Sequence, residues 1–350
     1  MCALGLLFYS KADMISTKSI EEPAGRPTWA GVDDMTDGKL KTKLLGIATL
    51  LLAALLWGVA FVAQSAGMEY IGPFTFTAAR SALAALGLAV MFLAFDRVGL
   101  SPKTTDRRRL WKAGLLLGVV MFTASNLQQV ALQYTSVGKA GFITSLYIVF
   151  VPIIGIFIKK KPHPMLWPSV LLAAVGLYFL SIRGGFSMGT GDLLTLGCAV
   201  AFAVHILVID HYAGALDVIR LNCIQFGVTA VLSAIPMLLW EKPTMTAVSQ
   251  AWLPIAYAGL ISGCVAYSLQ MIAQKRVEPT TASLLLSPES VFSALAGWVI
   301  LGQVLTGREL FGCSLVFLAV VGSQMPWGRI FRTVKVRSSK EESLPTAAGK

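Results

Sequence analysis

Charged side chains are scarce in this sequence. Asp, Glu, Lys and Arg make up 13% of the 350 residues, whereas soluble globular proteins carry about 25%. Hydrophobic residues make up 55%, and the mean hydropathy is +0.70. This composition excludes an ordinary soluble domain. The net charge of +11 does not indicate nucleic-acid binding, because the basic residues lie in short segments between apolar runs rather than along one polar face.

Paired cysteines are also missing. The sequence has five cysteines without paired spacing. Cys2 lies near the N-terminus, and the other four fall within apolar runs: Cys198, Cys223, Cys264 and Cys313. A cysteine in such a run usually behaves as a small hydrophobic residue. We therefore expect no disulfide, no metal site and no cofactor.

Catalytic motifs are lacking as well. The sequence has no H-E-x-x-H, no G-x-S-x-G and no phosphate-binding loop, and two of its three histidines, His163 and His211, lie at loop edges. A channel would need a ring of one charge or a repeated filter, and neither is visible. We therefore predict that the protein is not an enzyme. An integral membrane enzyme, or a channel or scaffold without active transport, is the alternative to a carrier.

Long apolar runs are what the sequence has instead. Crossing a hydrocarbon layer roughly 30 Å thick takes about 20 helical residues, and ten runs reach or approach that length. They cover residues 44–64, 73–95, 112–133, 138–158, 166–183, 191–211, 220–240, 252–273, 280–301 and 309–327.

These runs form two related halves. At an offset of 142 residues Leu127-Gln128 matches Leu269-Gln270 and Ser145 matches Ser287, and at an offset of 141 Val59-Ala60-Phe61 matches Val200-Ala201-Phe202. Because each half holds five spans, an odd number, the second half must enter the membrane in the opposite sense. The sequence therefore predicts an all-α integral membrane protein of ten transmembrane helices, arranged as two inverted five-helix repeats around a central cavity.

Lysine and arginine predict the orientation. With a cytoplasmic N-terminus, 20 of these residues fall on the cytoplasmic side and 4 on the outer side, a strong positive-inside asymmetry. We therefore expect both termini in the cytoplasm. The predicted domains are a disordered N-terminal tail (1–43), a first repeat (44–183), a second repeat (191–327) and a basic C-terminal tail (328–350).

Three motifs resemble the EamA domain of the drug/metabolite transporter superfamily. They are the segment 127–152 (LQQVALQYTSVGKAGFITSLYIVFVP), Gly-Asp-Leu-Leu at 191–194, and Glu-Pro-Thr-Thr-Ala-Ser-Leu-Leu-Leu-Ser at 278–287. The resemblance covers residues 44–327. It implies a ten-helix carrier of the bacterial inner membrane, often an exporter of metabolites, amino acids or drugs. In the ninth span this chain departs from the family's Leu-Glu-Pro and has Ser287-Pro288-Glu289-Ser290.

The strongest cases of ionisable residues well inside predicted spans, away from the span ends, are Arg80, His205 and Glu289. Such a group costs about 2.5–3.5 kcal/mol at mid-helix unless it faces a cavity or a partner. We expect Arg80 and Glu289 to face one cavity from opposite halves and to bind a charged or zwitterionic substrate, or Glu289 to carry a proton. The alternative is a buried ion pair that fixes helix register. His205 takes the place that Gln64 has in the first repeat, either as a ligand or coupling residue or as a hydrogen-bonded packing residue.

Amide side chains form two stripes. Asn126, Gln129 and Gln133 share one face of the third span, and Gln270 and Gln274 form the matching stripe of the eighth. Such amides either line a polar cavity or hydrogen-bond between helices, and both interpretations stay open.

Aromatic and small residues complete the pattern. Trp57, Tyr147 and Tyr267 are predicted to form apolar walls of the cavity. Tyr147 is favoured because it falls opposite Glu289 in the repeat, and the alternative for Trp57 is packing between helices. Gly114-x-x-x-Gly118 and Gly259-x-x-x-Gly263 predict close helix packing. Pro152 and Pro288 predict kinks in the fourth and ninth spans.

These features together predict a secondary transporter. It would move a small organic solute, such as a metabolite, an amino acid or a drug-like compound, across the plasma membrane by alternating access, with export expected. The expected partners are that solute and the lipid bilayer, without nucleic acid, and a homodimer is left open. The residues predicted to bind the substrate or couple transport are Arg80, Glu289, His205, Gln129, Gln270, Asn126, Tyr147 and Trp57.

Overall fold

The computed structural model describes residues 37–99, 106–135, 137–160, 162–164, 166–181, 189–302 and 306–324. In this part of the chain every regular element is a helix and no strand occurs. The predicted tails fall mostly outside the described residues. Residues 37–43, which the sequence assigns to the N-terminal tail, form the first turns of a helix.

Helices of the first half follow the predicted spans. They are α3 (Asp37–Gly67), α4 (Pro73–Arg97), α5 (Arg107–Ala131), α6 (Val137–Ser145), α7 (Tyr147–Phe157) and α8 (Leu166–Ser181). The fourth predicted span is thus divided into α6 and α7.

Helices of the second half are divided more often. They are α9 (Thr190–Tyr212), α10 (Val218–Pro236), η2 (Met237–Glu241), α11 (Met245–Gln250), α12 (Trp252–Ala256), η3 (Tyr257–Ala266), α13 (Tyr267–Gln274), α14 (Pro279–Leu286), α15 (Glu289–Leu301) and α16 (Gly307–Gln324). η2 and η3 are π-helical, and π-turns inside helices are frequent at functional sites.

Eight stretches of the described chain are long and apolar enough to cross a membrane. Four are the single helices α3, α4, α5 and α9. The other four are α6 with α7, α10 with η2, α12 to α13, and α14 with α15. The remaining two predicted spans are α8, whose apolar part covers Leu166–Phe179, and α16, which has Arg308 and Glu309 in its first turn. α8 and α16 pack against each other along their length.

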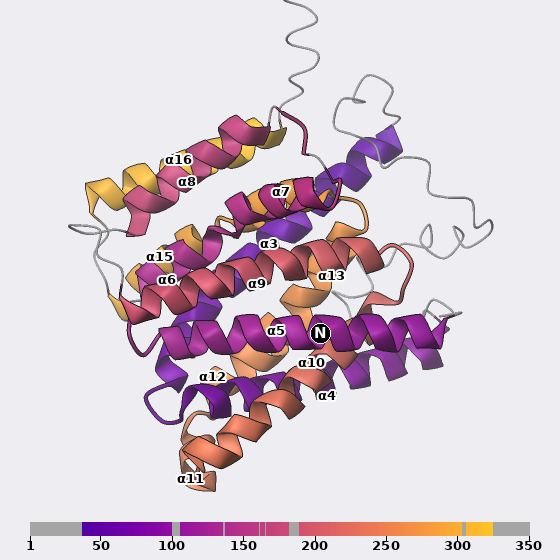
Figure 1. The fold of residues 1–350 in the computed structure, drawn as a ribbon, viewed down its shortest axis with the longest axis vertical. Coiled ribbons are helices and arrows are strands. Elements are labelled where there is room, and N and C mark those ends of the chain that lie inside the picture. Colours follow the sequence, from indigo (N-terminus) through magenta and orange to yellow (C-terminus); the bar gives the residue numbers. More distant parts are fainter. Residues whose placement is uncertain are drawn as a thin grey trace, which may run out of the picture.

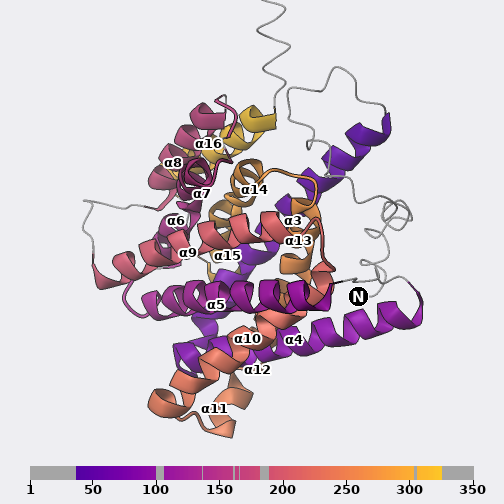
Figure 2. The same ribbon diagram turned by 45° about the vertical axis from the view of Figure 1, so that its right-hand side comes forward.

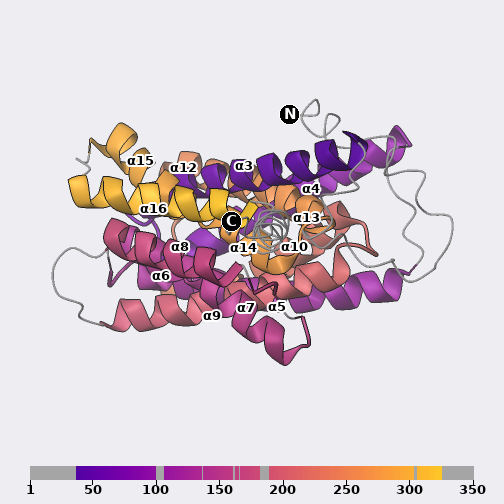
Figure 3. The ribbon, with the colours of Figure 1, turned by 90° about the horizontal axis from the view of Figure 1, so that it is seen from above.

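The helices are stacked in an elongated bundle with a helix pair at each end. Figure 1 shows α8 and α16 side by side at one end and α4 with α10 at the other, and Figure 2 confirms this order. Figure 3, a view from above, shows most of the helices running roughly along a common direction, and Figure 1 shows α13 crossing them. Between the two pairs, α3 packs on η3, α13 and α15, while α9 packs on α5, α6 and α7.

Glycines permit the close crossings that the sequence predicts. A Cβ atom on Gly118 of α5 would lie 2.5 Å from Cβ of Val228 in α10. A Cβ atom on Gly263 of η3 would lie 2.7 Å from Cβ of Ala84 in α4. Real side chains do not approach so closely, and only glycine fits these two crossings.

The fourth and ninth spans are interrupted at matching positions. α6 gives way to α7 at Leu146, and α14 gives way to α15 at Ser287 and Pro288. Pro288 has no N–H, and the hydroxyl of Ser287 donates to the carbonyl oxygen of Leu284 (2.8 Å). Pro152 lies inside α7, so the fourth span is interrupted before its proline rather than at it.

Ion pairs fasten α9 to the fourth span at both of its ends. Lys139 of α6 pairs with Asp192 in the first turn of α9 (2.6 Å), and Lys160, just after α7, pairs with Asp210 in its last turn. The contact between α3 and α15 also joins the two halves, and it contains Gly58. A Cβ atom on Gly58 would lie 2.8 Å from the carbonyl oxygen of Glu289.

Acidic side chains also fasten α4 to α10. Glu241 of η2 accepts hydrogen bonds from the backbone N–H groups of Phe74 and Thr75, in the first turn of α4 (2.9 and 2.7 Å). At the opposite end, Arg220 of α10 donates to both carboxylate oxygens of Asp96 (2.7 and 2.6 Å).

Candidate functional site

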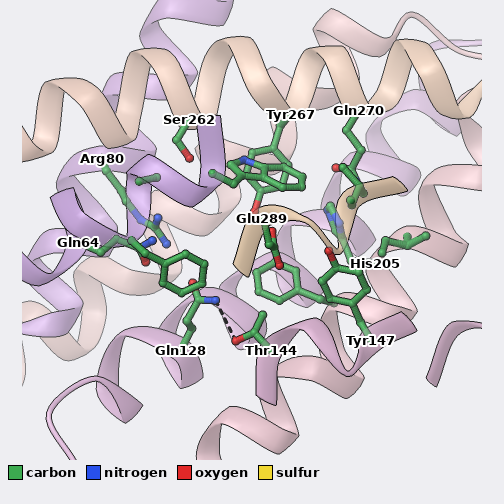
Figure 4. A pocket seen from close by; sticks show the side chains of 16 residues that line it. Gln64, Arg80, Gln128, Thr144, Tyr147, His205, Ser262, Tyr267, Gln270 and Glu289 are labelled. Atoms are coloured by element: carbon green, nitrogen blue, oxygen red, sulfur yellow. Dashed lines mark hydrogen bonds between the residues drawn. The ribbon is translucent and has the colours of Figure 1, made fainter. Parts of the chain in front are cut away.

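A pocket lies in the middle of the bundle, between the two halves (Figure 4). About 510 Å³ of space lies between its atoms, a volume that includes open solvent at its mouth. Its lining residues come from nine helices and η3: Trp57, Ala60, Phe61, Gln64, Arg80, Gln128, Thr144, Tyr147, Phe202, His205, Ile206, Ser262, Tyr267, Gln270, Leu286 and Glu289.

Most of the lining consists of pairs related by the internal repeat. At the offsets found in the sequence, five pairs of lining residues match: Phe61 with Phe202, Gln64 with His205, Gln128 with Gln270, Thr144 with Leu286, and Tyr147 with Glu289. The two halves therefore line the pocket at equivalent positions, but a neutral residue of one half can face an ionisable residue of the other, as with Tyr147 and Glu289.

Glu289 is the acidic group of the pocket. It is the first residue of α15, 4% exposed, and the hydroxyl of Ser145 in α6 donates to its Oε1 (3.3 Å). The Ser145 hydroxyl oxygen also lies 2.6 Å from that of Ser290, and the Ser290 hydroxyl oxygen lies 2.9 Å from the carbonyl oxygen of Gly141. The two serine protons are shared among these contacts and the one to Glu289, since each hydroxyl donates once. These hydroxyls tie α15 to α6 and set the position of the carboxylate.

Arg80 is the basic group of the pocket. Its guanidinium carbon lies 5.8 Å from the ring centroid of Phe76, one turn earlier in α4. No ion pair joins Arg80 to Glu289 in the described part of the chain. The alternative considered for these residues, a direct ion pair, is therefore not formed: Glu289 is held by Ser145 on α6, whereas Arg80 extends from α4 (Figure 4). Both side chains nevertheless line the same pocket.

Several polar atoms of the lining have no hydrogen-bond partner. Donors without an acceptor are Nε1 of Trp57, Nε of Arg80 and the hydroxyl of Tyr147, and acceptors without a donor are Oε1 of Gln64 and Oε1 of Gln270. A buried polar group that lacks a partner costs about 1–3 kcal/mol. Five such groups around one pocket indicate that a polar solute or water completes them.

His205 joins the pocket to a buried chain of polar side chains. Its Nε2 lies 2.9 Å from Oε1 of Gln225, and Gln225 donates through Nε2 to Oδ1 of Asn222 (2.8 Å). Asn222 in turn donates to the hydroxyl oxygen of Ser268 (3.1 Å). The chain crosses from α9 through α10 to α13, and each of its members is 5% exposed or less.

Aromatic rings form one wall of the pocket. Tyr267 packs against Trp57, with ring centroids 4.6 Å apart, and meets His205 edge to face at 6.0 Å. Phe202 meets the His205 ring in the same way at 6.4 Å. The wall is thus apolar on its surface and keeps the imidazole in place.

Six of the eight residues predicted from the sequence lie together around the pocket: Arg80, Glu289, His205, Gln270, Tyr147 and Trp57. Asn126 and Gln129 do not reach it. Asn126 donates to the hydroxyl of Ser233 in α10 (2.8 Å), and Gln129 donates to the backbone oxygen of Gln64 (3.4 Å). These two amides therefore bond neighbouring helices, which is one of the two roles considered for the stripe.

The amide of α5 that faces the pocket is Gln128, which donates to the hydroxyl of Thr144 (3.2 Å; Figure 4). Adjacent residues of a helix point about 100° apart, so the choice between Gln128 and Gln129 depends on how α5 is rotated. The repeat carries a signal for Gln128, since it matches Gln270. Ser262 and Tyr267 were not among the predicted site residues, and Tyr267 was considered only as a wall.

Comparison with known proteins decides the family. The model of the EamA-like transporter family matches residues 44–182 and, a second time, residues 189–324. The chain belongs to the EamA-like transporter family. It is therefore a multi-pass membrane transporter, as the resemblance of its motifs predicts.

Relatives of this EamA-like transporter are transporters as well. An uncharacterized transporter of Archaeoglobus fulgidus is 32% identical over 278 residues, which cover 79% of this chain and 84% of the relative. The threonine/homoserine exporter RhtA of Salmonella typhimurium is 30% identical over 184 residues, 49% of this chain and 58% of RhtA. A crystal structure with a TM-score of 0.67 and 21% identity covers 81% of this chain and 96% of its own, and it shares the fold.

Proposed function

We propose that this EamA-like transporter is a secondary carrier that exports a small zwitterionic solute, such as an amino acid, across the plasma membrane. The single observation that carries this proposal is the separation of Arg80 and Glu289 within one pocket. A buried charge without an ionic partner is costly, and a solute that brings a carboxylate to Arg80 and an ammonium group to Glu289 removes the cost for both residues.

The uncharged lining suits the rest of such a solute. Trp57 and Tyr147 carry unpaired donors, while Gln64 and Gln270 carry unpaired acceptors. A hydroxyl or amide group on the solute can meet either kind. The tilted pair of Trp57 and Tyr267 offers apolar contact to its carbon atoms.

Alternating access by two inverted five-helix repeats is the proposed mechanism. Its support is the pairing of lining residues from the two halves and the matching of helix contacts: α5 packs on α9 and α10, and η3 packs on α3 and α4. Interruptions at Leu146 and at Ser287–Pro288 fall at matching points of the two halves. Each half can then adopt the other's conformation, which moves the opening of the pocket from one membrane face to the other.

Export with both termini in the cytoplasm is the proposed direction and topology. The positive-inside asymmetry supports the topology, and the name of RhtA as a threonine/homoserine exporter supports the direction. The proposed boundaries of the repeats remain 44–183 and 191–327.

Counterflow in proteoliposomes tests this function. Vesicles with the purified protein are loaded with unlabelled L-threonine or L-homoserine, and the entry of the labelled compound is followed. We expect loaded vesicles to accumulate label above protein-free vesicles. N-acetyl-threonine, which lacks the ammonium group, and threonine methyl ester, which lacks the carboxylate, should compete poorly. Equal competition by both analogues would overturn recognition of a zwitterion.

A further inference from the structure

In the chain of polar side chains that joins His205 to Ser268, the direction of hydrogen-bond donation is set at Ser268. The hydroxyl of Ser268 donates to the carbonyl oxygen of Cys264, one turn earlier in the sequence (2.6 Å). With its proton engaged there, the Ser268 oxygen serves as an acceptor for Nδ2 of Asn222 (3.1 Å). The serine therefore fixes which way the asparagine amide points.

The orientation of the asparagine amide in turn sets the donors and acceptors up to the imidazole of His205. With Nδ2 of Asn222 engaged, its Oδ1 accepts from Nε2 of Gln225 (2.8 Å). This leaves Oε1 of Gln225 facing Nε2 of His205 at 2.9 Å. An amide oxygen can only accept, so the hydrogen bond requires a proton on Nε2, and the lone pair of the neutral ring is then on Nδ1.

Nδ1 is the ring nitrogen that the protein leaves available. In the described part of the chain no hydrogen bond to Nδ1 is made, and His205 lines the pocket. Phe202 and Tyr267 pack edge to face against the ring and restrain its orientation. The matching residue of the first half, Gln64, also has an acceptor without a partner, its Oε1.

We propose that Gln225, Asn222 and Ser268 are positioning residues that hold His205 as its Nε2–H tautomer, so that Nδ1 accepts a hydrogen bond from an N–H or O–H group of the transported solute. This inference rests on the proposed function for the identity of the ligand. The tautomer itself is a property of the folded protein without solute.

Nitrogen NMR tests the tautomer directly. The sequence has three histidines, so the double variant His163→Gln, His211→Gln leaves His205 as the only source of imidazole signals. In ¹⁵N-histidine-labelled protein at alkaline pH, where the ring is neutral, we expect Nε2 to carry the proton in the large majority of molecules. In a Gln225→Met variant this preference should weaken roughly tenfold, the loss of about one hydrogen bond. Predominant protonation of Nδ1, or no response to Gln225→Met, would overturn the positioning role.

Transport kinetics test the contact with the solute. Gln225→Met should raise KM roughly tenfold and leave the maximal rate nearly unchanged. Ser268→Ala, a milder change, should shift the tautomer and KM in the same direction by a smaller factor.

Gln274→Met is the matched control. Gln274 is a fully buried amide of α13 that donates to the carbonyl oxygen of Ile206 in α9 (3.1 Å), beside His205 but outside the chain. This variant should change neither the tautomer nor KM. Equal KM changes in Gln225→Met and Gln274→Met would mean that the hydrogen-bonded side chains behind His205 serve only helix packing. That result would overturn the contact with solute. A wild-type protein that holds the tautomer yet carries no tested solute would contradict the proposed function and support the positioning of His205.

Discussion

Glu289 is a buried carboxylate whose surroundings offer hydroxyl groups rather than a cation. Ser145 donates to it at 3.3 Å, and no ion pair to it is found in the described part of the chain. A carboxylate in this position is stabilised most by a positively charged group that enters the pocket. The energetics of solute binding are thus expected to be concentrated at this residue and at Arg80.

Replacement of Glu289 tests this expectation at the residue scale. Glu289→Gln keeps the shape of the side chain and removes its charge, so transport efficiency should fall roughly 10–100-fold, the value of a charge-assisted hydrogen bond. Initial rates of counterflow at several solute concentrations measure it, and Arg80→Gln should behave alike.

Glu309→Gln serves as the control for Glu289→Gln. Glu309 is 6% exposed, outside the pocket, and accepts from the backbone N–H of Thr306 (2.7 Å). Its replacement should leave transport unchanged. Similar losses in Glu289→Gln and Glu309→Gln would indicate a general folding defect.

The candidate site could be predicted from the sequence where an ionisable residue lies well inside a membrane span. Arg80, His205 and Glu289 stand out because ionisable groups are costly in a bilayer wherever the helix rotation places them. Amides give no such certainty: Gln128 faces the pocket and Gln129 bonds the backbone of Gln64, although they are adjacent. The absent ion pair between Arg80 and Glu289 could not be foreseen either, because it depends on Ser145 reaching the carboxylate from α6.

At the scale of elements, helix approach in this protein depends on single glycines. A Cβ atom on Gly118 would meet Val228 at 2.5 Å, whereas one on Gly227, in α10 next to Val228, would have no atom within 4 Å. Gly118→Ala should therefore destabilise the protein by about 1–3 kcal/mol. Gly227→Ala should stabilise it by about 0.5–1 kcal/mol. Thermal unfolding in detergent compares the two, and equal midpoints would contradict the close crossing of α5 and α10.

The first turn of α4 is expected to depend on a side chain from the second half. Glu241 accepts from two backbone N–H groups and from the hydroxyl of Thr75 (2.6 Å). Glu241→Gln replaces one acceptor oxygen by a donor, and the unfolding free energy should drop by about 1–2 kcal/mol. Denaturation of the purified protein measures this, with the exposed Glu69→Gln as a neutral control. An unchanged midpoint for Glu241→Gln would show that water replaces the cap.

The interruptions of the spans were harder to predict than the spans. Pro288 marks the end of α14, as expected, but the fourth span breaks at Leu146 although its proline is Pro152. The break at Leu146 follows the repeat, since Leu146 matches Pro288 at the offset of 142. The interruption of the fourth span is thus found at the position that the repeat indicates, six residues before its proline.

At the scale of the whole molecule, hydropathy alone predicts the helical fold, because a bilayer leaves a chain few ways to satisfy its backbone. It does not predict which helices touch. The pairing of α4 with α10, for example, involves Glu241 and Arg220, which lie far from α4 in the sequence.

The proposed topology makes a separate prediction. In a cysteine-free background, Lys242→Cys, after η2, should react with a membrane-impermeant maleimide added to intact cells. Lys112→Cys, in the second turn of α5, should react only after the cells are opened. Both lysines are exposed in the structure. Labelling of Lys112→Cys in intact cells would reverse the assigned orientation.

The charge pairs at the two ends of α9 make the two contacts between the halves, α9 with α6 and α7 and α3 with α15, unequal. Separating α9 from α6 and α7 requires breaking Lys139–Asp192 at one end of α9 and Lys160–Asp210 at its other end. Among described side chains no ion pair crosses the seam between α3 and α15, where glycine contact and dispersion hold the helices. The pocket should accordingly open to solute beside α3, while α9 stays in contact with α6 and α7.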